Sequence, residues 1–147
     1  MYTITGTKRG SMVIPPAYQV KPPFGANTGG INPAFVGVKK EAAFDSWLTV
    51  GIVKGDGGNE LGVAGLAADF KSWNEGKGIN NDDCGIFWMN PTKTRATNVG
   101  PVVLAQLTVS SSFTGVAQMG MEGKIIKPSP FAPLQLWRED KVKFTLN

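Results

Sequence analysis

The sequence contains no histidine, and this absence removes several kinds of functional site at once. Histidine is the commonest general base near neutral pH, the usual partner of a nucleophilic serine, and a common zinc ligand. Cysteine is almost absent as well: Cys84 stands alone, so the chain can form neither an internal disulfide nor a cysteine-based zinc site. A single thiol without a histidine to activate it is far more often a packing residue than a nucleophile. We therefore expect that the protein is not an enzyme and that it holds no metal and no cofactor.

Long apolar segments are also scarce. The first ten residues lack the apolar stretch of a secretory signal peptide. Residues 96–121 carry no charge and are long enough to raise the question of a membrane span, but Pro101, Gln106 and the serines at 110–112 interrupt them. This pattern predicts two strands and a turn, and we expect no membrane contact.

Acidic residues are missing from the first forty positions, which hold five of the ten prolines. The five basic residues of this stretch are Lys8, Arg9, Lys21, Lys39 and Lys40. The other 107 residues hold ten basic and eleven acidic side chains and are close to neutral. Proline removes backbone donors and fixes φ, so a proline-rich stretch favours irregular chain over a regular packed core. The sequence predicts an extended, Pro/Gly-rich basic arm over residues 1–40 and a compact domain over residues 41–147.

Two features of this arm suggest how it binds a partner. Tyr2 and Ile4 alternate with threonines as in a short strand, and such a segment can add to the open edge of a neighbour's sheet. The basic residues would meet acidic patches on that neighbour, with an affinity that falls as salt rises. Five basic residues over forty positions, without interleaved aromatics, are too sparse for a nucleic-acid site. The expected partners are therefore other copies of the chain or neighbouring proteins of an assembly.

Turn-forming residues divide the rest of the chain into short apolar segments. The 19 glycines and the scarcity of helix formers favour strands over helices. We predict strands at 46–53, 60–70 and 84–89, of which the second is ambiguous between strand and helix. Residues 101–109 and 113–121 flank the three serines as a predicted hairpin.

The C-terminal segment completes this pattern. A turn at Glu139-Asp140 is predicted to separate two strands, and in the second of them Val142, Phe144 and Leu146 share one face. About eight short strands at this spacing are typical of a sandwich or jelly roll. The predicted fold is all-β: an antiparallel β-sandwich or jelly-roll-like body that carries the N-terminal arm.

Four tryptophans are many for a chain of this length, and they allow two interpretations. Three of them lie within apolar strand segments, where aromatic rings supply much of the buried area of a thin core. The alternative is a platform on which sugar rings stack. Trp73 lies in the polar segment SWNEGKG and is the best candidate for an exposed ring. Trp47 would be the second residue of the platform.

Acidic residues gather in two turns, at residues 56–60 and 80–83. Their oxygens suit calcium, but neither turn has the alternating spacing of an EF-hand loop, and tight turns prefer Asp and Asn in any case. No spacing singles out a pair of carboxylates for glycoside hydrolysis either. We treat both segments as turns.

Three apolar strings carry a family resemblance: FDSWLTVG at 44–51, GIFWMNP at 85–91 and VVLAQLTV at 102–109. They resemble a β-rich module of algal secreted proteins and of virion proteins of large DNA viruses that infect algae. The resemblance covers residues 44–146 and brings no catalytic motif with it. It implies a β-rich fold and a non-catalytic role, and a single copy with a basic arm fits a small virion component better than an adhesive protein.

Two hypotheses of function follow. In the first, the protein is a structural virion component, a minor capsid or shell-associated protein, that assembles through its sandwich and its arm with capsid neighbours. In the second, it is a secreted carbohydrate-binding module in the extracellular space, with Trp73 and Trp47 against the sugar. An enzyme is a third and weaker hypothesis, because histidine and a recognisable acid–base pair are lacking.

Overall fold

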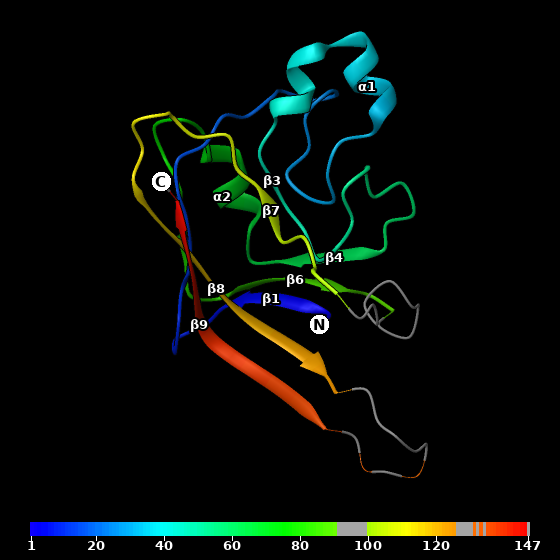
Figure 1. Ribbon diagram of the computed structural model, residues 1–147, viewed down its shortest axis with the longest axis vertical. Helices are drawn as coiled ribbons and strands as arrows, with labels where there is room; N and C mark the ends of the chain where they lie inside the picture. Colours follow the sequence, from blue (N-terminus) through cyan, green and yellow to red (C-terminus); the bar gives the residue numbers. More distant parts are fainter. Residues whose placement is uncertain (91–99, 126–130, 132, 134, 147) are drawn as a thin grey trace.

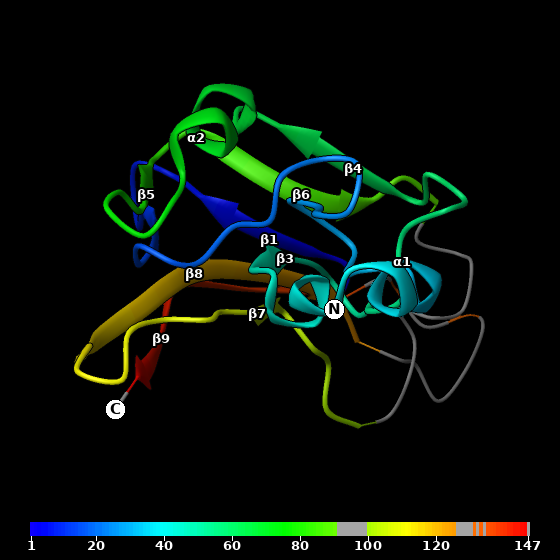
Figure 2. The same ribbon diagram turned by 90° about the horizontal axis from the view of Figure 1, so that it is seen from above.

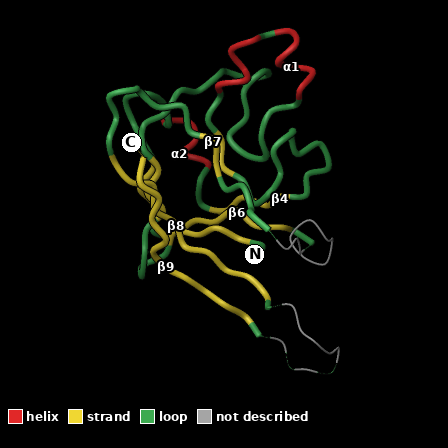
Figure 3. The backbone as a smooth tube through the Cα atoms, viewed as in Figure 1, coloured by secondary structure: helices red, strands yellow, loops and turns green. Residues whose placement is uncertain are grey.

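The computed structural model describes residues 1–90, 100–125, 131, 133 and 135–146. Strands and loops make up most of this chain, and the helices are few and short (Figure 3). In chain order the elements are β1 (Thr3–Gly6), β2 (Met12–Ile14), α1 (Pro33–Val38), the 3-10 helix η1 (Lys40–Phe44), β3 (Trp47–Leu48), β4 (Leu61–Ala64), α2 (Ala67–Ser72), β5 (Ile79–Asn81), β6 (Cys84–Trp88), β7 (Ala105–Gln106), β8 (Gly115–Lys124) and β9 (Leu136–Leu146). The prediction of a mostly antiparallel β protein is confirmed.

Seven strands form one antiparallel sheet in the order β4-β6-β1-β8-β2-β5, with β9 alongside β8. β1 and β2 both pair with the same edge of β8, one after the other: Thr5 lies opposite Gly120, and Val13 lies opposite Gln118. β6 and β5 flank β1 and β2 in the same way. In Figure 1, β1 (blue) accordingly lies between β6 and β8.

A tight turn at residues 7–10 separates β1 from β2 and interrupts this line of strands in the sheet. Thr7 and Gly10 exchange two backbone hydrogen bonds of 2.9 Å, so the residues between them form a tight turn. β5 and β6, which flank β2 and β1, are likewise separated from each other, at Asp82-Asp83. On the far side, the register between β8 and β9 shifts by one residue near Asp140. The turn predicted at Glu139-Asp140 is therefore wrong: β9 runs on through this point as one strand with a β-bulge.

A second, two-stranded sheet of β3 and β7 packs on the first (Figure 2). Leu48 of β3 pairs with Ala105 of β7, while β8 pairs with β9, so the hairpin predicted between 101–109 and 113–121 does not form. The core between the sheets draws side chains from both. Those at most 1% exposed include Ile4, Met12, Ile14, Leu48, Val50, Ile79, Ile86 and Met119.

The helices lie in the connections between strands and do not form a layer of their own. The ambiguous segment 60–70 divides between β4 and α2, with Gly65 between them at a positive φ of 72°. α1 begins after Asn32, whose side chain accepts a hydrogen bond of 3.0 Å from the backbone of Ala34. α1 and η1 lie at one end of the molecule, and the β8–β9 pair extends toward the other (Figure 1).

The structure corrects the prediction of a free N-terminal arm. Residues 3–6 and 12–14 are interior strands of the sheet, and their side chains Ile4 and Met12 are fully buried. The predicted boundary at residue 40 also fails, because strands from both sides of it pair in one sheet. The prolines and glycines of this stretch predict irregular chain, but its strands β1 and β2 pair with strands that lie about 65 to 120 residues away along the chain.

Candidate functional site

The long edge strand β9 leaves one side of the main sheet open. It pairs with β8 from Leu136 to Leu146, and within the described ranges its other edge has no strand beside it. None of its eleven residues is buried. The unpaired N–H and C=O groups of such an edge can hydrogen-bond to a strand of another molecule.

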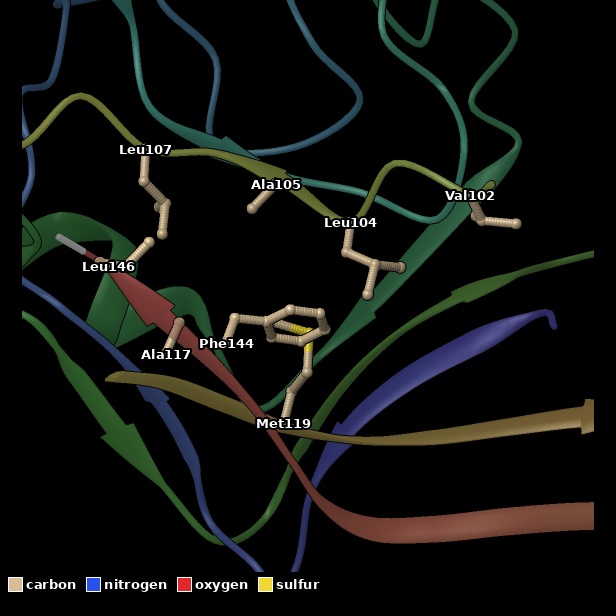
Figure 4. A pocket seen from close by; sticks show the side chains of 8 residues that line it. All are labelled: Val102, Leu104, Ala105, Leu107, Ala117, Met119, Phe144 and Leu146. Carbon is tan, nitrogen blue, oxygen red and sulfur yellow. The ribbon is translucent and has the colours of Figure 1, made fainter. Parts of the chain in front are cut away.

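An apolar cleft of about 300 Å³ lies beside this edge. Figure 4 shows side chains of the segment around β7 on one side of it and those of β8 and β9 on the other. All the side chains that line it are aliphatic, aromatic or thioether groups: Val102, Leu104, Ala105, Leu107, Ala117, Met119, Phe144 and Leu146. The cleft is therefore suited to apolar side chains and offers no group for acid–base chemistry.

At the end of β9, side chains point alternately to the face of the sheet that carries the cleft and to the opposite face. Phe144 lies opposite Ala117 and Val142 lies opposite Met119, on the face toward the cleft, whereas Lys143 and Thr145 belong to the other face. The predicted shared face of Val142, Phe144 and Leu146 is consistent with this register. Phe144 is still 38% exposed, so one apolar side chain of the cleft remains open to a partner.

The first half of β9 is protected by charge and by the bulge. Arg138 forms ion pairs with Glu122 at 3.2 Å and with Asp140 at 2.6 Å. Charged side chains and a bulge are the usual means by which an edge strand resists pairing. The open part of the edge is therefore its last five residues, 142–146, in which Lys143 is the one charged residue. We name this segment together with the cleft the β9 site.

The predicted partner-binding residues of the N-terminus do not gather at the β9 site. Ile4 is fully buried between β6 and β8, so it cannot add to a neighbour's sheet, and this part of the prediction is wrong. Tyr2 is half-buried, with the ammonium of Lys124 5.8 Å from its ring centroid. Both edges of the strand predicted to bind a partner are thus occupied within its own subunit.

The basic residues of the same stretch stay at the surface. Lys8 forms an ion pair of 2.7 Å with Asp82, which joins the turn at residues 7–10 to the connection between β5 and β6. The ammonium of Lys39 lies 5.8 Å from the ring centroid of Phe24. Arg9, Lys21 and Lys40 are exposed. These residues are spread over the turn at residues 7–10, the loop before α1 and the α1–η1 junction, and they do not follow one strand or helix. Their contact with a partner stays a prediction.

Trp73 and Trp47, the two residues of the predicted sugar platform, are core residues instead. Trp73 is only 3% exposed, and its indole N–H donates a 3.0 Å hydrogen bond to the carbonyl of Pro15. Trp47 is 5% exposed. The predicted exposed ring at Trp73 is therefore wrong, because its polar neighbours in sequence lie outside while the ring itself turns inward against the N-terminal segment.

A polar cleft of about 580 Å³, which the sequence did not predict, lies between the loop before α1 and the loop before β4. Its rim includes the ring of Phe35, which is 38% exposed and packs edge-on against Phe24 with 5.9 Å between centroids. Lys54 and Asn59 face the same space. The cleft combines an aromatic surface with hydrogen-bonding groups, and no local sequence pattern marks it because its two walls are about thirty residues apart.

The acidic turn at 56–60 is explained by its own backbone. The carboxylate of Asp56 accepts hydrogen bonds from the backbone N–H groups of Glu60 at 2.8 Å and Leu61 at 2.9 Å. Among the residues that the structure describes, no three His, Cys, Asp or Glu side chains are placed to hold a metal ion. Asp56 thus has a structural task in the turn.

Two buried ionisable groups are structural as well. Asp45 is fully buried, and burial raises the pKa of its carboxyl, although backbone N–H groups of Val20, Ala26 and Ser46 act in the opposite direction. Burial also raises the pKa of the Cys84 thiol to about 11. A thiol with this pKa is almost entirely protonated at neutral pH and is a poor nucleophile.

Comparison with known proteins identifies no relative. No family model, no curated protein and no solved structure matches the chain. Among the described residues, no helix has the length and apolar character to cross a membrane. The function is inferred from two surface features of the described residues, the β9 site and the polar cleft.

Proposed function

We propose that the protein is a structural subunit that assembles with other copies or with neighbouring proteins. The observation that carries this proposal is the open segment 142–146 of β9 beside an apolar cleft. A strand added to this edge gains main-chain hydrogen bonds from β9, and its alternate side chains enter the cleft beside Phe144. This is a means of joining molecules rather than of transforming a substrate.

The setting we propose is a virion, in which the chain is a minor capsid or shell-associated protein. Its support is the resemblance of the segments 44–51, 85–91 and 102–109 to a β-rich module of algal viruses, together with the two-sheet architecture. In this proposal the two sheets act as a sandwich-like building block, an architecture that virus shells often use. The β9 edge replaces the N-terminal arm as the joining element.

Chemical cross-linking of the assembly in its native source tests this function. Lys143 lies in the open edge, and Lys77 lies exposed in a turn far from it in the sheet order and serves as the internal control. We expect the protein to co-sediment with particles, and amine-reactive cross-links to join Lys143 to a neighbouring subunit at several times the yield of Lys77. Recovery of the native protein free of any particle, without cross-links at Lys143, would overturn the proposal.

The polar cleft favours a second candidate function, a carbohydrate-binding module, with different residues from those predicted. Phe35 offers an exposed aromatic ring, and Lys54 and Asn59 offer hydrogen-bonding groups beside it. Sugars combine apolar C–H faces with hydroxyls and therefore suit such a lining. Glycan-array binding that disappears in Phe35→Ala but survives in Phe44→Ala, a 61% exposed ring that does not line this cleft, would support it. No binding to any glycan would reject it.

A further inference from the structure

We propose that the occupant of the β9 site is a second copy of the same chain, paired antiparallel through residues 142–146 about a twofold axis at Phe144. This inference rests on the proposed assembly function and names its partner. It depends on three observations: the open edge, the side-chain pattern of this segment, and the position of the cleft under it.

The segment Val-Lys-Phe-Thr-Leu is complementary to itself when Phe144 lies opposite Phe144. Val142 of one copy then lies opposite Leu146 of the other, and Lys143 lies opposite Thr145. Residues directly opposite one another in an antiparallel pair lie on the same face of the sheet. The register with β8 places 142, 144 and 146 on the cleft face and 143 and 145 on the other, so every pair across the twofold axis joins residues of the same face.

Charge favours this register over the one with its axis at Lys143. With the axis at Phe144, no two like charges meet within residues 142–146. With the axis at Lys143, two lysines would stand directly opposite each other, which is unfavourable. A shift of one residue in either strand would place cleft-facing side chains opposite outward-facing ones. The bulge and the ion pairs of Arg138 end the favourable stretch on the other side.

The pairing also covers the apolar surface that the single molecule leaves open. Phe144 and Leu146 line the cleft from β9, and Phe144 is 38% exposed. In the pair, these side chains from both copies lie next to one another on one face, so the two clefts become a continuous apolar strip under the joined sheet. Both open edges disappear in the same step, which removes the unpaired backbone groups of residues 142–146 from water.

A charge variant tests the register. Thr145→Lys sets a lysine against Lys143 at both symmetry-related places, and two unfavourable cross-strand pairs weaken a dimer by about two- to thirty-fold. The double variant Lys143→Glu with Thr145→Lys sets opposite charges at the same places and should restore dimerisation. Glu75→Gln changes the net charge by the same amount as Thr145→Lys at an exposed turn and should leave dimerisation unchanged. Sedimentation equilibrium over a range of protein concentrations measures the dissociation constant, and circular dichroism verifies that each variant is folded.

A cysteine variant locates the axis independently. Directly opposite residues of an antiparallel pair have Cα atoms about 4.5–5.5 Å apart, which a disulfide can bridge. In a Cys84→Ser background, Phe144→Cys should form a covalent dimer on mild oxidation, whereas Thr145→Cys should not. A monomeric wild-type protein at all concentrations would overturn the inference, as would a dimer that Thr145→Lys leaves unchanged. Cross-linking of the native assembly tests the proposed function separately, so a monomer in solution would overturn the self-pairing alone.

Discussion

Asp45 provides the sharpest test of how the loops around the second sheet are held. Its fully buried carboxylate accepts hydrogen bonds from the backbone N–H of Val20 at 2.6 Å and of Ala26 at 2.7 Å. These two bonds fix the loop between residues 20 and 26 against the start of β3. Asp45→Ala removes both acceptors and leaves two N–H groups without this partner.

The expected cost follows from those two groups. A buried donor that loses its partner costs about 1–3 kcal/mol, so Asp45→Ala should lower the free energy of unfolding by about 4 kcal/mol. For a chain of this length that corresponds to a fall of roughly 10 °C in Tm. Asp45→Asn keeps one acceptor oxygen and should cost about half as much. Urea unfolding followed by circular dichroism measures both, with Glu75→Ala as an exposed control that should cost less than about 0.5 kcal/mol.

The pH dependence of the same variants tests the sign of the electrostatic effect. Because burial raises the pKa of Asp45, the folded protein retains the proton at pH values where the unfolded chain has lost it. The contribution of Asp45 to stability therefore falls as pH rises from the ordinary aspartate value of about 3.9 toward the raised value. Asp45→Asn should remove this slope. A cost below about 1 kcal/mol for Asp45→Ala, or an unchanged slope in Asp45→Asn, would refute the reasoning.

Three further predictions concern other parts of the core. Gly30 has a positive φ of 79°, and a Cβ built there would overlap the carbonyl group of Val53, so Gly30→Ala should destabilise the protein by about 2 kcal/mol or more in urea unfolding. Cys84, with a pKa of about 11 and 9% exposure, should react with a thiol reagent at pH 8 only at the rate of unfolding, and a rate equal to that of the unfolded chain would contradict its burial. Trp88 donates its indole N–H to the carbonyl of Val50 at 2.8 Å, so Trp88→Phe should cost about 1–3 kcal/mol by the same unfolding assay, and an unchanged midpoint would exclude this bond as a contributor.

Local patterns in the sequence predict several strands but not their neighbours. The alternation at 84–89 predicts β6 within one residue, because one face of that strand is uniformly apolar. The three serines at 110–112 suggest a hairpin, yet the segment before them pairs with β3 and the segment after them with β9. Pairing depends on packing between distant segments, which no local pattern contains.

The candidate site shows the same limit. The shared face of Val142, Phe144 and Leu146 is readable from alternation, whereas the open edge and the cleft appear only when β7 and β8 are in place. The polar sequence neighbours of Trp73 predict an exposed ring. Its indole instead finds the carbonyl of Pro15, fifty-eight residues away, which satisfies the one polar group of the ring.

The central position of β1 has a consequence for biosynthesis. Its two flanking strands are β6 and β8, so its hydrogen-bond partners leave the ribosome only after residues 84–87 and 120–122 have been made. At a synthesis rate of about 5–20 residues per second, the nascent chain carries Ile4 and Met12 unprotected for several seconds. A prematurely terminated chain that lacks β8 would leave one edge of both β1 and β2 unpaired. We expect such products to aggregate or to be degraded rather than to persist as folded fragments.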